Sequence, residues 1–231
     1  FHEVFHSIYN FCVVDMSSFY LDVLKDRLYT FRTDSVERRS AQWVLSRILS
    51  MMTKLMAPIL SFTAEEVWQN IRTNSQFTGQ GNREIEESVF LASFPAADAT
   101  YYNRQLEEKW DNLFVLRNEV NKALEMKRSE RFLGNSLEAK VILYLPGSYK
   151  DLLTEKRDFL PTFFIVSAVE LTDESMKASY RSTEIEGLEI TIERAAGMKC
   201  QRCWNWSTTV GTFTDKPDIC GRCYKVVVHN E

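Results

Sequence analysis

Apolar side chains recur every three to four residues along the first 70 positions, which is the period of amphipathic α-helices. This pattern predicts one helix over residues 1–14 and a second that begins after Asp15, whose carboxylate can cap the first turn. A third helix is expected to open within Thr33–Glu37 and to run up to Pro58, and a fourth follows a capping box at Thr63–Glu66. Four helices with short connections predict an antiparallel helical bundle.

The pattern changes after the fourth helix. Residues 73–88 are polar and rich in Gly, Asn, Gln and Ser, which predicts a loop, and Val89–Leu91 suggests a short extended piece. A long amphipathic helix is predicted from Asn103 to about Arg131, with Gly134 and Asn135 at its end.

Beyond this helix the hydrophobic period becomes that of strands. Strands are expected at residues 139–145, 163–169 and 188–193, with a short helix after Pro146 and Gly147. The predicted fold class is therefore mainly α with a small α+β module. We expect four parts, namely a bundle at 1–74, a linker and long helix at 75–135, an α/β junction module at 136–196 and a cysteine-containing module at 197–231.

The end of the chain contains two Cys-x2-Cys pairs, Cys200–Cys203 and Cys220–Cys223, separated by 16 residues. This spacing is typical of a four-thiolate zinc site, because each pair makes a tight turn that brings two sulfurs onto one ion. Four protein ligands leave no position for a reactive water, so the site is expected to be structural. The alternatives, two disulfides or four unrelated thiols, are disfavoured because Cys12 is the only further cysteine and the composition is not disulfide-rich.

The formal net charge of −4 over 231 residues does not by itself indicate a nucleic-acid-binding protein. Residues 190–231 contain six Lys or Arg and four Asp or Glu, so only the cysteine-rich end is slightly basic. Trp204 and Trp206 beside Arg202 would suit RNA, because unpaired bases stack on aromatic rings while cations neutralise phosphates. The alternative is that the tryptophans pack over the metal-binding turns, since so small a module has little other core.

Two basic edges of the predicted bundle could line a groove for a phosphate backbone. Lys25 and Arg27 end one helix, and Arg38 and Arg39 lie in the first turn of the next. Local ion pairs on a solvated helix face are the alternative. No glycine-rich phosphate-binding loop and no His-based dyad occurs, so the sequence predicts no catalytic residues.

Several segments resemble isoleucyl-tRNA synthetases of the bacterial type, in their anticodon-binding helical domain and their C-terminal zinc module. The segments are Asn10–Leu21, Lys25–Tyr29, Arg38–Gln42, Ala57–Trp68, Lys199–Trp204 and Cys220–Cys223. The resemblance implies a part of a class I enzyme that attaches isoleucine to its tRNA with ATP. The His-Ile-Gly-His and Lys-Met-Ser-Lys-Ser loops of such catalytic domains are absent from this sequence.

The resemblance further implies that this piece of a longer polypeptide grips the anticodon arm of isoleucine tRNA and binds no ATP itself. We expect one structural zinc ion, contact with the remainder of the same enzyme, a monomeric state, a cytoplasmic location and no membrane contact. RNA contacts are carried over to Lys25, Arg27, Arg38, Arg39, Arg202, Trp204 and Trp206.

Two other functions are compatible with parts of the sequence. The zinc module also resembles the zinc finger of formamidopyrimidine-DNA glycosylases, which would make the chain a DNA-repair protein, but the helical segments do not fit that class. The chain could also be a structural module that packs against the rest of the enzyme and touches no RNA. Burial of Trp204 and Trp206 would favour this second alternative.

Overall fold

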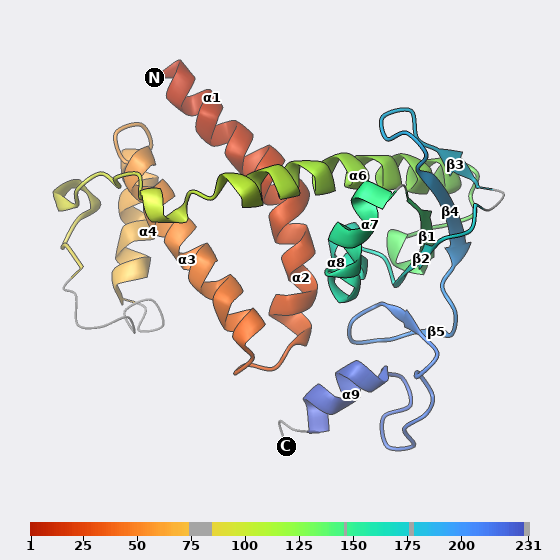
Figure 1. Ribbon diagram of the computed structural model, residues 1–231. Helices are drawn as coiled ribbons and strands as arrows, with labels where there is room; N and C mark the ends of the chain where they lie inside the picture. Colours follow the sequence, from red (N-terminus) through yellow and green to blue (C-terminus); the bar gives the residue numbers. More distant parts are fainter. Residues whose placement is uncertain (74–84, 146, 176–177, 229–231) are drawn as a thin grey trace. The chain divides into compact units, whose positions relative to one another are not determined.

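The structure is a computed structural model that describes residues 1–73, 85–145, 147–175 and 178–228. The chain forms two compact units (Figure 1). Residues 1–28 and 33–102 make up the first unit, and residues 29–32 and 103–231 make up the second. Both units are described separately below. Within the described residues, no helix is both long and apolar enough to cross a membrane.

The first 30 residues form one uninterrupted helix. Helix α1 (His2–Asn10) continues through wider π-helical turns at Phe11–Tyr20 into α2 (Leu21–Thr30). The predicted helix start at Asp15 is wrong, because Asp15 lies inside the π-helical segment. The two residues that flank this segment, Asn10 and Leu21, also keep right-handed helical angles. Since residues 1–30 contain neither glycine nor proline, nothing in the backbone forces a break.

Helix α3 (Val36–Met56) begins as predicted. Its N-cap is Ser35, whose hydroxyl accepts a hydrogen bond from the backbone N–H of Arg38 at 3.2 Å. Helix α4 (Ser61–Thr73) starts earlier than predicted, so the capping box at Thr63 is wrong. The backbone N–H of Ala64 instead donates to the Leu60 carbonyl at 2.8 Å, which places Thr63 within the helix.

Glu65, one member of the expected capping box, binds residues 88 and 89 to α4 through hydrogen bonds. Its carboxylate accepts hydrogen bonds from the Ser88 hydroxyl at 2.8 Å and the backbone N–H of Val89 at 3.0 Å. Hydrogen bonds from Gln69 and Ser88 lower the pKa of Glu65. Residues Val89–Leu91 form a 3-10 turn and not the predicted extended piece, because Val89 must turn inward to pack on Trp68.

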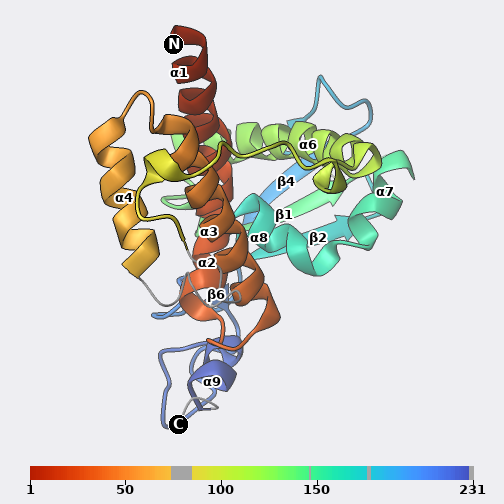
Figure 2. The ribbon, with the colours of Figure 1, turned by 90° about the vertical axis from the view of Figure 1, so that its left-hand side faces the viewer.

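In the second unit, helix α6 (Arg104–Ser129) lies beside a four-stranded sheet with α8 (Leu160–Phe164) (Figure 2). Asn103 caps α6 by accepting from the N–H of Leu106 at 3.0 Å. The helix ends before the predicted Gly134, because Arg131 already adopts a positive φ of 58°. Leu116 and Val120 are fully buried on the face of α6 that meets the rest of the unit.

The sheet is mixed, with strand order β2-β1-β4-β3. Strand β1 (Ala139–Tyr144) pairs parallel with β2 (Ala168–Thr172) and antiparallel with β4 (Glu189–Arg194), which also pairs with the short β3 (Tyr180–Arg181). The predicted strand at 163–169 is wrong in its first half. Phe163 lies in α8, and Ile165, which follows that helix with a φ of 57°, redirects the chain toward β2.

The remaining elements are short. The chain also forms α7 (Gly147–Thr154), α9 (Gly221–Val228), β5 (Met198–Lys199), β6 (Trp206–Ser207), and 3-10 turns at Ala99–Tyr101, Ser136–Glu138 and Arg157–Phe159. The described part of the chain is therefore mainly helical with two small sheets, in agreement with the predicted fold class at this level. Part of the predicted 73–88 loop, and the turn at Pro146, lie outside the described residues.

Glu119 of α6 is a buried carboxylate that ties the helix to the edge of the sheet. Its side chain is 1% exposed and accepts hydrogen bonds from the Tyr180 hydroxyl at 2.9 Å, from Lys122 at 2.6 Å and from Ser182. Burial raises the pKa of Glu119, but the three hydrogen bonds outweigh it and hold the pKa below 4.5. The charged carboxylate therefore stabilises the fold at neutral pH.

We predict that Glu119→Ala lowers the free energy of unfolding of the second unit by about 2–3 kcal/mol at pH 7, because three donors lose their acceptor. Urea denaturation followed by circular dichroism measures this loss. Glu125→Ala is the matched control on the same helix, since Glu125 is 63% exposed and pairs only at the surface with Arg128. The control is expected to change stability by less than about 0.5 kcal/mol.

The same variant tests the sign of the pKa shift. A carboxylate whose folded pKa is lowered stabilises the fold above its ordinary value of 4.5, and this contribution is lost as the pH falls through the folded pKa. The stability gap between the parent chain and Glu119→Ala should therefore narrow on acidification below that value. A gap that stays constant from pH 7 to the acid limit would contradict the assignment of Glu119 as a buried anion.

Candidate metal centre

The first cysteine pair lies in the turn of a small hairpin. Strands β5 and β6 pair antiparallel, and two backbone hydrogen bonds close the chain between them. The N–H of Cys200 donates to the Asn205 carbonyl at 2.9 Å, and the N–H of Trp204 donates to the Cys200 carbonyl at 2.9 Å. Trp204 follows Cys203 with a φ of 64°, which closes the turn and leaves its ring exposed.

Gly197 makes this hairpin possible. Its φ is 89°, and a Cβ added there would lie 2.2 Å from the carbonyl carbon and oxygen of Ser207. Any larger residue would therefore push the two strands of the hairpin apart. The cysteine turn depends on a backbone approach that glycine alone allows.

The second cysteine pair opens helix α9, which the sequence analysis did not predict. Cys220 precedes the helix and Cys223 lies in its first turn, where the N–H of Tyr224 donates to the Cys220 carbonyl at 2.9 Å. The Tyr224 ring stacks on Phe213 with centroids 3.9 Å apart and planes at 9°. This stack fixes the helix against the long loop that joins the two pairs.

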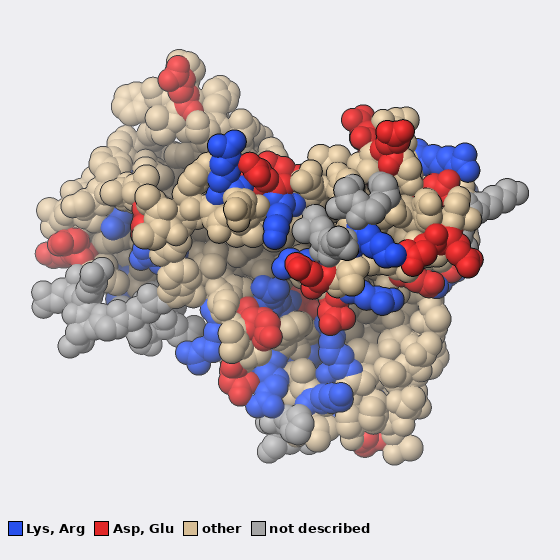
Figure 3. All heavy atoms as spheres, viewed as in Figure 1, with Lys and Arg blue, Asp and Glu red and all other residues tan. Residues whose placement is uncertain are grey.

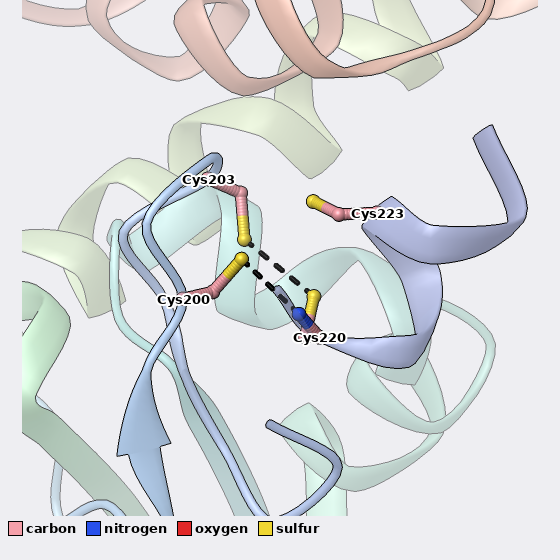
Figure 4. A group of neighbouring side chains, drawn as sticks. All are labelled: Cys200, Cys203, Cys220 and Cys223. Carbon is pink, nitrogen blue, oxygen red and sulfur yellow. Dashed lines mark hydrogen bonds between the residues drawn. The ribbon is translucent and has the colours of Figure 1, made fainter. Parts of the chain in front are cut away.

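The four sulfurs point toward one another (Figure 4). All four lie within 4.8 Å of one another, and the Cys203 and Cys220 sulfurs are 3.7 Å apart. Zinc–sulfur bonds of about 2.3 Å in a tetrahedron place neighbouring sulfurs about 3.8 Å apart. The backbone N–H of Cys220 also donates to the Cys200 sulfur at 3.3 Å.

Hydrogen bonds among the neighbouring cysteine sulfurs shift the pKa values of three of them. A hydrogen bond with Cys220 raises the pKa of Cys203 to about 11, and hydrogen bonds with Cys203 and Cys220 raise that of Cys223. The same bonds lower the pKa of Cys220. A divalent cation at the centre would hold all four as thiolates, because metal ligands must be deprotonated.

The metal centre is also the core of the module. Cys200, Cys220 and Cys223 are buried together with Val210 and Ile219, and Cys203, Tyr224 and Val227 pack against them. So small an apolar cluster contributes little stability without a cross-link. The donor set, its spacing and its burial all fit a closed structural zinc site.

Arg202 lies inside the first cysteine pair and is half-buried. Its guanidinium donates to the Thr30 carbonyl oxygen at 2.6 Å and lies 3.6 Å from the Cys223 sulfur. Residues 29–32 group with the second unit, as the zinc module does. The Thr30 partner lies 172 positions away along the chain, so no local pattern in the sequence could have indicated it.

The two tryptophans of this module lie in different surroundings. Trp204 is 60% exposed, and the Lys199 ammonium lies 5.4 Å from its ring centroid. Trp206 is half-buried, and its backbone N–H donates to the Ser167 hydroxyl at 2.7 Å, which links the module to the sheet. Lys199 was not among the residues predicted to contact RNA, although it directly precedes Cys200 in the sequence.

The four basic residues expected on the bundle lie in the first unit. Lys25 is exposed and pairs with Asp22 at 2.6 Å, and Arg27 is half-buried in the last turn of α2. Arg38 is half-buried and Arg39 exposed in the first turn of α3. Figure 3 shows Lys and Arg side chains intermixed with Asp and Glu side chains on the face that it displays.

Two segments of the chain match known protein families. Residues 1–143 match the family described as the anticodon-binding domain of tRNA ligase, and residues 197–226 match the zinc finger found in FPG and IleRS. The chain therefore belongs to the family of anticodon-binding domains of tRNA ligases. The zinc-finger match and the cluster of four cysteines together support one structural zinc ion.

Curated relatives named isoleucine–tRNA ligase match almost the whole chain. That of Syntrophotalea carbinolica is 46% identical over 98% of this chain and 23% of its own length. Those of Caldanaerobacter subterraneus and Moorella thermoacetica are 45% and 43% identical over 96% and 98% of the chain. The chain spans about a quarter of the length of these relatives.

We predict that Cys203→Ser abolishes tight zinc binding and opens the module from about residue 197, because metal binding supplies the folding free energy of so small a unit. Limited proteolysis with mass spectrometry should show new cleavages after residue 197, with the far-ultraviolet helical signal largely retained. Cys12→Ser is the matched control, since Cys12 lies in the π-helical segment far along the chain from the pairs. Protease resistance of the Cys203→Ser tail equal to that of Cys12→Ser would refute the prediction.

Proposed function

We propose that this chain is the tRNA-binding region of an isoleucine–tRNA ligase, which attaches isoleucine to its tRNA using ATP. The proposal rests on the anticodon-binding family match and on the isoleucine–tRNA ligase relatives. In this role the chain recognises and clamps the anticodon arm. ATP binding and the catalytic residues belong to other parts of the enzyme, which act on the acceptor end.

Trp204 with Lys199 is the observation that most supports RNA contact by the zinc module. A 60% exposed tryptophan is held outward by the cysteine turn, with a cation over its ring. An unpaired base stacks well on such a ring, and the ammonium can meet the phosphate that follows it. Trp206 contributes less RNA contact in this proposal, because it is half-buried and bonded to Ser167.

The basic residues of the bundle are proposed to meet the phosphate backbone. Arg39 and Lys25 are exposed, so both can reach phosphates at little desolvation cost, although Lys25 would have to exchange its ion pair with Asp22. Arg27 and Arg38 are half-buried, so they would contact RNA along one edge only. Arg202 is proposed to act near RNA mainly by shaping the turn that presents Trp204, since its guanidinium already bonds to Thr30.

The division of labour follows the four parts expected from the sequence. We propose that residues 1–74 form an antiparallel helical bundle of the anticodon-binding type and that 75–135 connect it to a junction module at 136–196. Residues 197–231 would form a zinc ribbon with one structural Zn²⁺. The partners are isoleucine tRNA and the remainder of the enzyme, and the chain is proposed to act as a monomer in the cytoplasm.

A purely structural role for the zinc module is the second candidate. The bonds of Arg202 to Thr30 and of Trp206 to Ser167 favour it, because both residues take part in internal packing. The exposure of Trp204 weighs against it, since a packing residue of that size is normally covered. The two candidates differ in whether removing the Trp204 ring affects RNA affinity.

We predict that the zinc-loaded chain binds isoleucine tRNA and that Trp204→Ala weakens this binding by about 5- to 150-fold, the effect of losing one stacked base. Fluorescence anisotropy at two salt concentrations measures the affinity. Trp204→Phe is the matched control, because a phenyl ring still stacks and should retain most of the affinity. Equal affinity of all three chains would instead support the structural role.

The anticodon of the tRNA provides a second comparison. A transcript of the same tRNA with a swapped anticodon should bind more weakly if this region reads anticodon bases. Equal affinities that fall steeply with salt would indicate a phosphate clamp without base recognition. No binding even at low salt would contradict the proposed function of this region.

A further inference from the structure

Residues 29–32, which are the last two residues of α2 and the first two after it, are called the turn here. Two arginines that occupy the same place in each cysteine pair link this turn to the zinc module. The pairs read Cys-Gln-Arg-Cys and Cys-Gly-Arg-Cys, so Arg202 and Arg222 each directly precede the second cysteine. Arg202 donates to the Thr30 carbonyl at 2.6 Å, and the Arg222 guanidinium lies 5.8 Å from the ring centroid of Phe31. Two independent contacts thus reach two successive residues of one turn.

Arg202 also approaches a candidate zinc ligand directly. Its guanidinium nitrogen, which bonds to Thr30, lies 3.6 Å from the sulfur of Cys223. Groups that hydrogen-bond to metal ligands orient those ligands and typically change metal affinity by about 10- to 100-fold when removed. Thr30 is 6% exposed, so its carbonyl has little water available to replace the guanidinium.

We propose that residues 30 and 31 form an outer shell of the zinc site, with Arg202 as the positioning residue, so that zinc binding and the ordering of this turn are coupled. Arg202 holds the Cys223 sulfur and the Thr30 carbonyl at once, and Arg222 adds its contact with Phe31. Such coupling is reciprocal at equilibrium. The factor by which an ordered turn raises zinc affinity is therefore the factor by which bound zinc favours the ordered turn. The turn joins the last two residues of α2 to the connection before α3, so a metal site near residue 200 would influence a segment near residue 30.

This coupling goes beyond the proposed function, because it concerns metal retention and local order and needs no RNA. It also assigns a role to Arg202 that differs from direct phosphate contact. A chain that binds no tRNA would leave the coupling unaffected. Conversely, failure of the coupling would leave the proposed RNA role of Trp204 intact.

The first test measures the rate at which zinc passes from the zinc-loaded 231-residue chain to an excess of a chromophoric chelator. Arg202→Met is expected to release zinc about 10-fold faster or more than the parent chain. Arg194→Met is the matched control in the same unit, since Arg194 also donates to a backbone carbonyl, that of Phe132 at 2.7 Å, and stacks on that ring. Equal release rates for the two variants would overturn the proposal.

A second variant guards against failure of Arg202→Met to fold. Phe31→Ala leaves every residue of the zinc module unchanged and removes only the ring that Arg222 covers. Its zinc should also leave several-fold faster than from Arg194→Met. A release rate equal to that of the control would show that the turn has no influence on the metal and would refute the coupling.

Hydrogen–deuterium exchange tests the reverse direction of the coupling. Removing zinc with the chelator should speed exchange in peptides that cover residues 29–32 as well as in the zinc module. Peptides from the buried middle of α6, around Leu116 and Val120, serve as the internal control and should be unchanged. Fast exchange confined to residues 198–228, with the turn unaffected, would contradict the proposal.

Discussion

The convergence of four cysteine sulfurs is the constraint on which the terminal module depends. Thiols this close cannot all ionise beside one another, and backbone N–H groups, Arg202 and Arg222 offset only part of their charge. A divalent cation removes this conflict and cross-links two segments that share only a small apolar core. The outward position of Trp204, the start of α9 and the turn at residues 29–32 all follow from how the sulfurs are held.

The rest of the second unit supports this module through ordinary packing and one buried charge. Helix α6 covers the sheet with a fully apolar stripe except at Glu119, whose donors come from α6 itself and from the sheet edge. Ser167, just before β2, then accepts from the backbone of Trp206. A continuous set of contacts therefore runs from the long helix through the sheet to the metal centre, which gives the exposed tryptophan a fixed base.

The sequence predicted features that rest on local rules. The cysteine spacing identified the metal site, the predicted starts of α3 and α6 were right, and the apolar run after residue 139 is a strand. Prediction from the sequence failed where contacts between distant residues determine the local structure. Asp15 has the side chain of a helix cap but lies inside a continuous helix. Phe163 was assigned to a strand because a short apolar run fits a strand and a buried helix equally well. Glu65 accepts a hydrogen bond from a segment more than 20 residues away. The contact of Arg202 with Thr30 has no local signature.

The claim that a single zinc ion organises the end of this chain is tested most directly by X-ray absorption at the zinc edge on the purified protein. The account predicts one zinc per chain, surrounded by four sulfur atoms at about 2.3 Å with no oxygen or nitrogen ligand. Replacing any one of the four cysteines should introduce a lighter ligand or remove the metal. A native spectrum with mixed sulfur and oxygen ligands, or a chain that folds fully without zinc, would contradict it.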